Sequence, residues 1–510
     1  MAALKNWLIL LVIIGTVCRF INLDHKLFSH DEVYTILRSS GYSSEVLTQV
    51  LFSNLLTTAP EILQYQQIKP NSSIVDTIVS LAKEDPQHPP LYFLVNRWWL
   101  ELFGSSVLSA RLLPALIGAI AIPIMYLLAQ ELFRNDLASW LAMALLAWSP
   151  FDILYAQIAR QYSLLTLLVI LSSYLLLRSL RWHRGWWGYS LAMAGGLYTH
   201  PFFGFTILAH GGYILALRSG LYFRNYLESC AGAVSLFSPW LVVIISNLQR
   251  ALGTTNWTSS SPDWLYLPKL WLLSFTALFF DLDVGFDNPL TYLLRLPFLI
   301  LFGWGIYLLW QHQENKPWLF ILANFAIPFL ILAIPDLITG GRRSSVSRYL
   351  ISCFPAIQLA VAYLFSYYLQ GKFTKFKFGW LVGLVTCFTA SIASVTVSSL
   401  ANTWWTNVPS YFNANTAQIL NRSDRAVLIA DAGYDGTNLG DIISLAHLLQ
   451  PTVPIYLAKK PEFNFPPIVT NSPEQFVFRP SPELRSLLSQ RSENLVLVDQ
   501  TGGDLWKIEK

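Results

Sequence analysis

Residues 108–133 read LSARLLPALIGAIAIPIMYLLAQELF, an apolar run with charged residues only near its two ends. A helix of this length rises far enough to cross about 30 Å of bilayer hydrocarbon. Similar runs recur through most of the chain, which is 54% hydrophobic and 13% charged, with a mean hydropathy of +0.45. This composition excludes an ordinary soluble enzyme and predicts an integral membrane protein.

The apolar runs predict about eleven membrane-spanning helices in the first 400 residues. Basic clusters favour the cytoplasmic side, and placing Lys5 there puts the basic residues of every later inner loop on the same side. The predicted spans are residues 6–22, 108–133, 137–151, 162–179, 186–199, 202–217, 227–246, 289–310, 317–335, 349–369 and 379–400.

Two further apolar stretches, residues 91–103 and 264–280, are predicted not to cross the membrane. Counting either stretch as a span would invert the charge bias of all the loops that follow it. Each stretch also contains or adjoins charged residues, so we expect helices that lie along the outer interface. The first outer loop, residues 24–107, therefore contains interfacial helices.

The composition turns polar near residue 404. Residues 426–430, 453–457 and 495–498 have the apolar, β-rich pattern of short strands, and residues 441–449 and 483–488 have a helical pattern. We therefore predict two domains: an all-α polytopic membrane domain, residues 1–403, and a small extracytoplasmic α/β domain, residues 404–510.

The first outer loop begins with His30-Asp31-Glu32. Adjacent acidic residues are common at the start of a solvated helix, because they favour its N-terminus. A carboxylate at the membrane surface can also accept the proton of an attacking hydroxyl as a general base. Asp31 is our candidate for the base, and Glu32 could support it or bind a divalent cation.

The same loop ends with DPQHPPLY at residues 85–92. The two prolines alone explain a rigid turn before the interfacial helix. His88, held by this turn, could instead donate a hydrogen bond to a phosphate.

Residues 149–162 read SPFDILYAQIARQY and lie between the third and fourth predicted spans. Arg160 could be an interfacial arginine that reaches toward water. Its alternative role is a planar, permanently charged donor to a phosphate oxygen. The other site candidates in this stretch are Asp152, Tyr155, Gln157 and Tyr162.

Two later outer turns carry basic residues, against the usual charge bias. His200 lies in YTHP at residues 198–201, where a packed turn residue is the simpler interpretation. Arg342, Arg343 and Arg348, followed by Tyr349, occupy the turn before the tenth span. An anionic ligand or an anionic lipid would explain cationic residues at these places.

Five motifs in this order resemble glycosyltransferase family 39, which includes the protein O-mannosyltransferases and is similar to the lipid A aminoarabinose transferases. They are Asp31-Glu32, HPPLY at residues 88–92, the stretch at 149–162, YTHP at 198–201 and SRYL at 347–350. The resemblance covers roughly residues 5–400. It implies a GT-C fold, with Asp31 at the family's essential acidic position, Arg160 at its arginine in the second outer loop, and Arg348 where the donor phosphate is expected.

One departure from the related transferases affects metal binding. Where the aminoarabinose transferases carry Glu-Lys before the paired prolines, this chain has Gln87-His88, so a metal ligand is missing. Metal dependence stays open, and Glu32 and His200 are the possible ligands of a divalent cation. No other cofactor is expected.

The resemblance implies an enzyme that moves a sugar from a polyprenyl-phosphate donor to an acceptor hydroxyl on the extracytoplasmic face, with inversion and with Asp31 as base. The acceptor could be a protein, a lipid or a glycan. We expect the protein in a plasma or inner membrane, where membrane lipids are its other partners. No nucleic-acid partner is expected. The alternatives are a transporter or flippase of lipid-linked sugars and a non-catalytic scaffold. Transporters tend to have repeated halves, and this chain does not divide in that way.

Overall fold

The computed structural model describes residues 2–260, 263–282, 284–312, 316–371, 374–423, 425–434, 436–490, 494–498 and 503–509. The chain forms two compact units, each assembled from separated segments. The membrane unit comprises Met1–Ile21, Asp85–Tyr92 and Arg111–Ser399. The sheet unit comprises Asn22–Glu84, Phe93–Ala110 and Leu400–Lys510.

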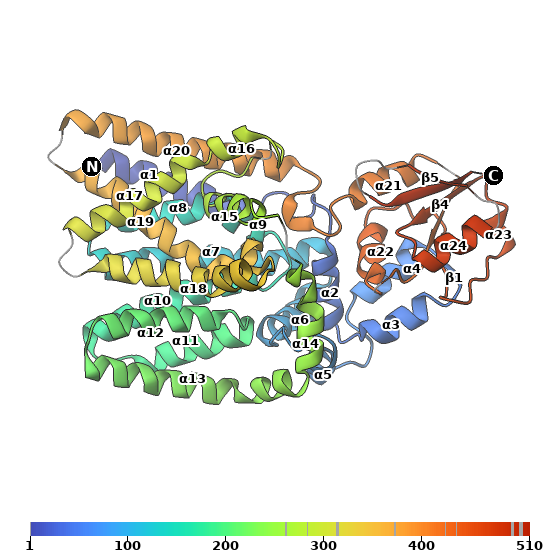
Figure 1. Cartoon of the computed structure of the whole chain (residues 1–510), viewed down its shortest axis with the longest axis horizontal. Coiled ribbons are helices and arrows are strands. Elements are labelled where there is room, and N and C mark those ends of the chain that lie inside the picture. Colours follow the sequence, from blue (N-terminus) through green and yellow to red (C-terminus); the bar gives the residue numbers. More distant parts are fainter. Residues whose placement is uncertain are drawn as a thin grey trace. The chain divides into compact units, whose positions relative to one another are not determined.

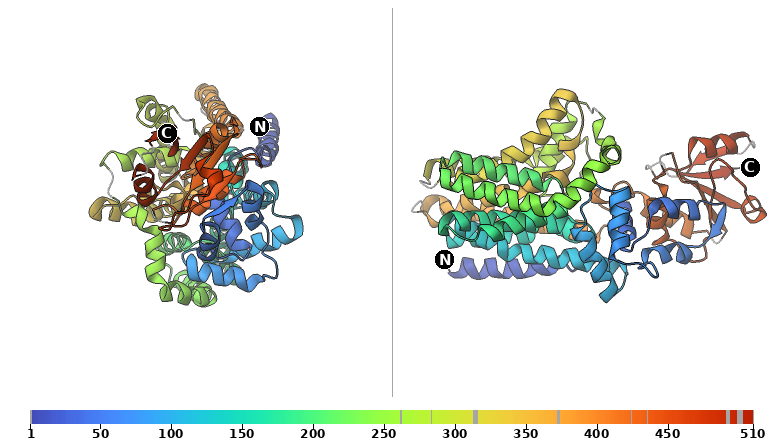
Figure 2. Two further views of the ribbon diagram at one scale, coloured as in Figure 1. Left: turned by 90° about the vertical axis from the view of Figure 1, so that its right-hand side faces the viewer. Right: turned by 90° about the horizontal axis from the view of Figure 1, so that it is seen from below.

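Long apolar helices run side by side in the membrane unit, as Figures 1 and 2 show. Seven candidate spans in the described part of the chain are long and apolar enough to cross a membrane, or eight if the pair α8 and α9, bent by 54°, forms one span. The helices are α1 (Ala2–Cys18), α7 (Val107–Phe133), α8 (Asp136–Trp148), α9 (Pro150–Ala156), α10 (Tyr162–Trp182), α11 (Trp186–Thr199), α12 (Phe203–Ala216), α13 (Gly220–Ser246), α14 (Leu248–Thr255), α15 (Tyr266–Thr276), α16 (Pro289–Leu293), α17 (Leu296–His312), α18 (Pro317–Thr339), α19 (Phe354–Gln370) and α20 (Thr374–Leu400), with 3-10 turns η2 (Asn256–Ser259), η3 (Arg343–Ser345) and η4 (Ser347–Cys353).

Each predicted span coincides with helical structure, which confirms the helical membrane fold. α1 and α12 are shorter apolar helices than the seven candidate spans. The two stretches predicted to lie at the interface are also helical: α6 (Leu91–Phe103) has 13 residues and α15 has 11. Both are shorter than the ~20 residues that a helix needs to cross the hydrocarbon.

Connections predicted for the inner side contact one another through charged and polar side chains. Lys5 lies 3.3 Å from the Asp136 carboxylate. Arg181 lies 3.1 Å from the Glu131 carboxylate. These contacts bring the N-terminus and two later loops to one end of the bundle, as the charge pattern predicted.

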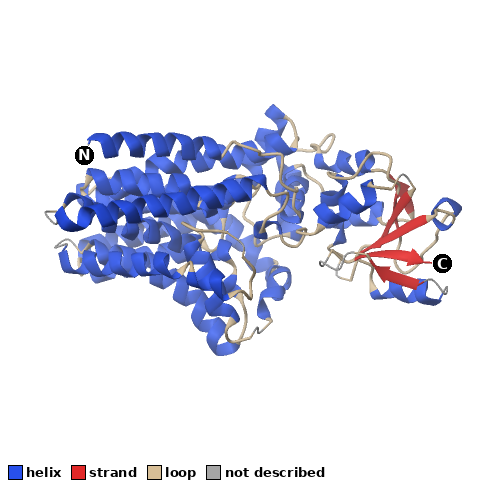
Figure 3. Ribbon diagram, turned by 90° about the horizontal axis from the view of Figure 1, so that it is seen from above, coloured by secondary structure: helices blue, strands red, loops and turns tan. Residues whose placement is uncertain are grey.

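Among the described residues, the sheet unit has six strands in the order β1-β3-β2-β4-β6-β5. Figure 3 draws the strands in red. β2 pairs in parallel with β3 and β4, whereas the other neighbours are antiparallel. The strands are β1 (Leu55–Thr57), β2 (Ala426–Ala430), β3 (Ile455–Leu457), β4 (Glu474–Phe478), β5 (Asn494–Leu497) and β6 (Leu505–Glu509), and the helices are α2 (His30–Ser39), α3 (Ser44–Leu51), α4 (Ala59–Leu63), η1 (Gln64–Gln66), α5 (Ile74–Glu84), η5 (Trp405–Asn407), α21 (Asn413–Asn421), α22 (Asn438–Ala446), α23 (Pro467–Thr470) and α24 (Pro482–Gln490).

These units differ from the predicted division at residue 403, because a strand of the first outer loop completes the C-terminal sheet. β1 pairs with β3, with Leu56 opposite Tyr456. The Asn54 side-chain oxygen accepts hydrogen bonds from the Tyr456 hydroxyl at 3.0 Å and from the Lys459 amide at 3.0 Å. The first outer loop and the C-terminal segment therefore fold together.

Close helix packing in the membrane unit generates a stability prediction at two glycines of α17. A Cβ added to Gly305 would lie 2.5 Å from the backbone oxygen of Ala360 in α19, whereas a Cβ added to Gly303 meets no atom within 4 Å. We expect Gly305→Ala to lower the thermal unfolding temperature of the purified protein in detergent, because backbone must move to admit the methyl group. Gly303→Ala is the matched control, and an equal unfolding temperature for the two variants would contradict the packing of α17 on α19.

Candidate functional site

Four basic side chains from separate connections of the membrane unit come together. His88 lies in Asp85–Tyr92, Arg160 in the turn between α9 and α10, His200 in the turn between α11 and α12, and Arg348 in η4. His88, Arg160 and Arg348 each act electrostatically on His200, which places all four in one neighbourhood. We call these four residues the cationic cluster.

Aromatic rings pack between the members of the cationic cluster. The His200 ring lies 6.4 Å from the ring of Tyr162 and 6.3 Å from that of Tyr349. The guanidinium of Arg160 is 5.8 Å from the Tyr162 ring centre, and that of Arg348 is 5.7 Å from the Tyr349 ring centre. The negative ring faces attract these cations and hold their planar groups in a defined orientation.

His200 is the most buried imidazole of the cluster, with 6% of its surface exposed. Burial, and then the nearby charges of His88, Arg160 and Arg348, lower the pKa of His200 from 6.5 to about 3. At neutral pH the His200 ring is therefore uncharged, and its Nδ1 lies 3.1 Å from the backbone nitrogen of Phe202. The arginines supply the fixed positive charge, whereas His200 offers a dipole.

His88 is tied to the loop that carries Arg160. Its Nδ1 lies 3.3 Å from the amide nitrogen of Gln161, which directly follows Arg160. The backbone oxygen of Pro86 accepts a hydrogen bond from the Trp240 indole at 3.1 Å, so α13 holds the same turn. The proline turn is thus held by the Arg160 loop and by α13, and it brings His88 to the cluster.

The other two arginine candidates have different surroundings. Arg343 lies 3.5 Å from the Asp336 carboxylate, and the Ser344 backbone nitrogen donates to the same carboxylate at 2.6 Å. Arg342 donates to the backbone oxygen of Trp257 at 3.1 Å. The guanidiniums of Arg342 and Arg348 lie 5.3 Å and 5.9 Å from the Trp257 ring centre. Arg342 therefore borders the cluster through Trp257, whereas the charge of Arg343 is balanced by Asp336.

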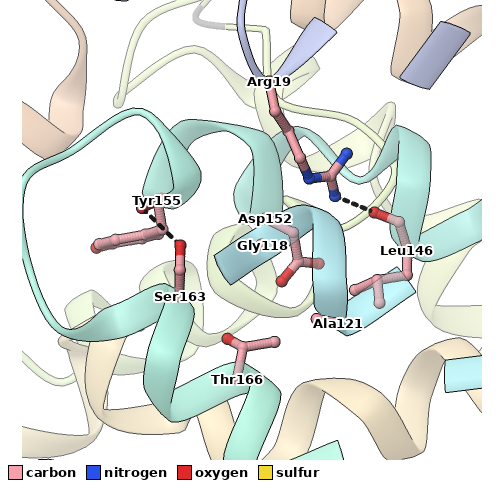
Figure 4. Close-up of a pocket in the computed structure, with 8 residues that line it drawn as sticks. All are labelled: Arg19, Gly118, Ala121, Leu146, Asp152, Tyr155, Ser163 and Thr166. Carbon is pink, nitrogen blue, oxygen red and sulfur yellow. Dashed lines mark hydrogen bonds between the residues drawn. The ribbon is translucent and has the colours of Figure 1, made fainter. Parts of the chain in front are cut away.

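Asp152 lines a separate buried pocket together with Arg19, as Figure 4 shows. Its carboxylate accepts a hydrogen bond from the Gln358 amide at 2.9 Å. Arg19 is 1% exposed and donates to the backbone oxygens of Leu146 at 2.8 Å and Gly15 at 2.8 Å. The pocket is also lined by Gly118, Ala121, Tyr155, Ser163 and Thr166.

Arg19 is the main residue that the sequence analysis missed. It ends an apolar run on the side opposite to Lys5, and a basic residue there opposes the usual charge bias. The sequence therefore marked Arg19 as unusual, but it did not show the partners of its guanidinium. These are the backbone oxygens of Leu146 and Ala147 and the charge of Asp152. Asp152 and Arg19 thus stabilise the junction of α1, α8 and α9.

Two further candidates hold the Arg160 loop in place. The Gln157 amide donates to the backbone oxygens of Cys18 at 3.1 Å and Ile21 at 2.9 Å, which anchors the loop to the end of α1. The Tyr155 ring lies 5.1 Å from that of Tyr162, and the Ser163 hydroxyl donates to the Tyr155 backbone oxygen at 3.1 Å. These contacts position the loop on both sides of Arg160.

The acidic pair lies in the first turn of α2, in the sheet unit. Asp31 is half-buried. Glu32 is fully buried, and its carboxylate accepts from the Ser29 backbone nitrogen at 3.0 Å and from the Ser29 hydroxyl at 3.1 Å. Glu32 thus closes the start of the helix. Within the described residues, no group of three or more His, Cys, Asp or Glu side chains is placed to bind a metal ion.

Comparisons with known proteins support the family resemblance. Residues 87–243 match the family described as dolichyl-phosphate-mannose-protein mannosyltransferase. No curated protein matches the chain by sequence.

Several solved structures are similar to the chain. ArnT from Cupriavidus metallidurans bound to undecaprenyl phosphate has 15% sequence identity and a TM-score of 0.56, with 99% of this chain and 98% of that chain covered. The apo form of the same protein has 14% identity and a TM-score of 0.53 over the same shares. An oligosaccharyltransferase from Archaeoglobus fulgidus, in complex with zinc and sulfate, has 12% identity and a TM-score of 0.49 over 88% of this chain and 62% of that chain.

The likeness to ArnT extends over nearly the whole chain and confirms the predicted GT-C fold. The family match covers residues 87–243, which is less than half of the chain, and the fold alone does not give the activity. The chain is a multi-pass membrane protein with the GT-C fold.

Proposed function

We propose that the protein transfers a sugar from a polyprenyl-phosphate donor to an acceptor hydroxyl, and that the cationic cluster binds the donor phosphate. The observation that carries the proposal is the meeting of Arg160, Arg348, His88 and His200 from four separate connections. Cationic and neutral hydrogen-bond donors held together at the end of apolar helices suit a lipid whose head group is an anion.

Two similarities to known proteins support this class of donor. The matching family is named for a dolichyl-phosphate sugar, and the similar ArnT structure contains undecaprenyl phosphate. A polyprenyl chain would lie among the apolar helices and its phosphate would reach their polar ends. The membrane unit offers both an apolar helix surface for the polyprenyl chain and polar helix ends for the phosphate.

The reaction must break the bond between C1 of the sugar and the phosphate oxygen. As that bond breaks, its electron pair moves to the phosphate, and negative charge grows there. Arg160 and Arg348 are fixed charges that stabilise the leaving group without rearrangement of solvent. His200 is neutral at pH 7 and contributes only as a dipole, because burial and its cationic neighbours lower its pKa to about 3.

Asp31 is the proposed general base. It would accept the acceptor hydroxyl proton while the oxygen attacks C1 opposite the leaving phosphate, so a single displacement inverts the configuration at C1. Glu32 would hold the helix start through Ser29. If the reaction needs a divalent cation, Glu32 or His200 would be its ligand, and metal titration of donor binding tests this.

The proposed active face is extracytoplasmic. Lys5 and Arg181 have acidic partners at one end of the bundle, and their loops carry the basic bias of a cytoplasmic face. The connections that form the cationic cluster alternate with these loops along the chain. The acceptor is a hydroxyl of a protein, a lipid or a glycan.

Substitution of Arg160 tests the proposed phosphate site. We expect Arg160→Gln to weaken binding of undecaprenyl phosphate in detergent by about ten- to a hundredfold, because a charge-assisted hydrogen bond contributes ~1.5–3 kcal/mol. His200→Gln exchanges one neutral donor for another and is expected to change the affinity far less. Equal affinities for Arg160→Gln and the unmodified protein would remove Arg160 from the phosphate site.

Substitution of Asp31 tests the proposed base. We expect Asp31→Asn to reduce sugar transfer in proteoliposomes by about 10²- to 10⁴-fold, the range typical of a lost general base, with donor affinity retained. Labelled donor distinguishes transfer of the sugar from movement of the lipid across the bilayer. Glu32→Gln is the paired variant, because glutamine supports the same helix cap. Wild-type transfer by Asp31→Asn would show that another group takes the proton.

A further inference from the structure

We propose that the C-terminal segment positions the start of α2, and with it Asp31, through contacts of Ser410, Gly440 and Asp441 with His30. This inference rests on the proposed function of Asp31. It makes these residues positioning residues of the transfer reaction, and it assigns the C-terminal segment a part in catalysis.

Hydrogen bonds connect the first residue of α2 to the C-terminal segment. The His30 backbone nitrogen donates to the Ser410 hydroxyl oxygen at 2.9 Å. That hydroxyl donates to the Asp441 carboxylate at 2.7 Å. The first amides of a helix have no partner within the helix, so an outside acceptor fixes where the helix starts. Ser410 supplies this acceptor directly before Asp31.

The His30 side chain adds a second link to the same carboxylate. Its Nδ1 lies 3.5 Å from Asp441 Oδ2, and Arg479 forms an ion pair with this oxygen as well. Burial would raise the pKa of Asp441, but hydrogen bonding to His30 and the charges of His30 and Arg479 outweigh it and hold the pKa below its usual value. Asp441 is fully buried, and because its pKa is lowered it presents a carboxylate anion to the start of α2.

Gly440 allows this close approach. A Cβ at Gly440 would lie 2.5 Å from His30 Nδ1 and 2.7 Å from the Tyr34 ring. Glycine within a helix is less favourable than alanine by about 1 kcal/mol, so its presence in α22 suits a position where no side chain fits. α22 packs on α2 here, as Figure 1 shows.

Neighbouring contacts hold the same part of the loop. The Leu27 backbone nitrogen donates to the Asn402 oxygen at 2.9 Å, and the Phe28 ring lies 4.9 Å from that of His447. The chain just before α2 is thus bound to the C-terminal segment at two successive positions, Leu27 and Phe28. Asp31 follows His30 directly, so a shift of this contact shifts the carboxylate.

The test uses two substitutions in the full-length protein, Ser410→Ala and Gly440→Ala. Both are expected to lower kcat for sugar transfer by about ten- to a hundredfold, because a misplacement of ~1 Å can cost about 10²-fold in rate. The Kd for undecaprenyl phosphate should stay within twofold. Amide hydrogen exchange of residues 27–39 should become faster. Ser472→Ala is the matched control, because the Ser472 hydroxyl bonds only within the C-terminal segment, to the Arg425 oxygen at 2.9 Å.

The outcomes separate this inference from the proposed base. Faster exchange in residues 27–39 with unchanged kcat would overturn the positioning role. Unchanged exchange and unchanged kcat would show that these contacts do not hold α2. A parallel loss of affinity for undecaprenyl phosphate would also overturn the positioning role, since a general disturbance of the protein would then explain the lower kcat. If Asp31→Asn keeps full activity, the proposed base fails, and the exchange measurement still reports whether Ser410 and Gly440 hold the helix.

Discussion

An arginine side chain keeps its charge in a protein, so a guanidinium among apolar helices must be matched by dipoles, counter-ions or an anionic ligand. The membrane unit meets this constraint in three ways. Arg19 donates to backbone carbonyls and faces Asp152. Arg343 pairs with Asp336. Arg160 and Arg348 lie on the faces of tyrosines beside a neutral His200. Only the third arrangement gathers several cationic groups, and it is the one suited to a phosphate.

The two groups of connections are chemically different. Loops with the basic bias match their charges with acids, as Lys5 with Asp136 and Arg181 with Glu131. The connections around the cationic cluster combine arginine with imidazoles and tyrosines. A buried histidine close to two guanidiniums stays neutral, so adding the imidazole does not increase the electrostatic repulsion. The cluster can therefore hold several hydrogen-bond donors close together before any anion arrives, and this preorganisation is what stabilisation of a leaving phosphate requires.

Local chemistry made much of the fold predictable, because apolar length alone marks a helix that can cross a bilayer. β2 was predicted over its full length, since residues 426–430 are all apolar. β1 was missed because it has three residues and depends on pairing with Ile455–Leu457, some four hundred residues away. For the candidate site, too, local patterns were readable and long-range packing was not. Motifs placed Arg160 and His88 in outer turns, but the separation of Asp152 into the pocket of Arg19 depends on helix packing that no local pattern encodes.

The two residues of the acidic pair, Asp31 and Glu32, have different surroundings. Glu32 is buried and bonds Ser29, so it fixes the helix start from within the loop. Ser410 accepts from His30 and fixes the same start from the C-terminal segment. Asp31 is the half-buried member of the pair. The proposed base therefore follows a backbone that is held from two sides, by the loop and by the C-terminal segment.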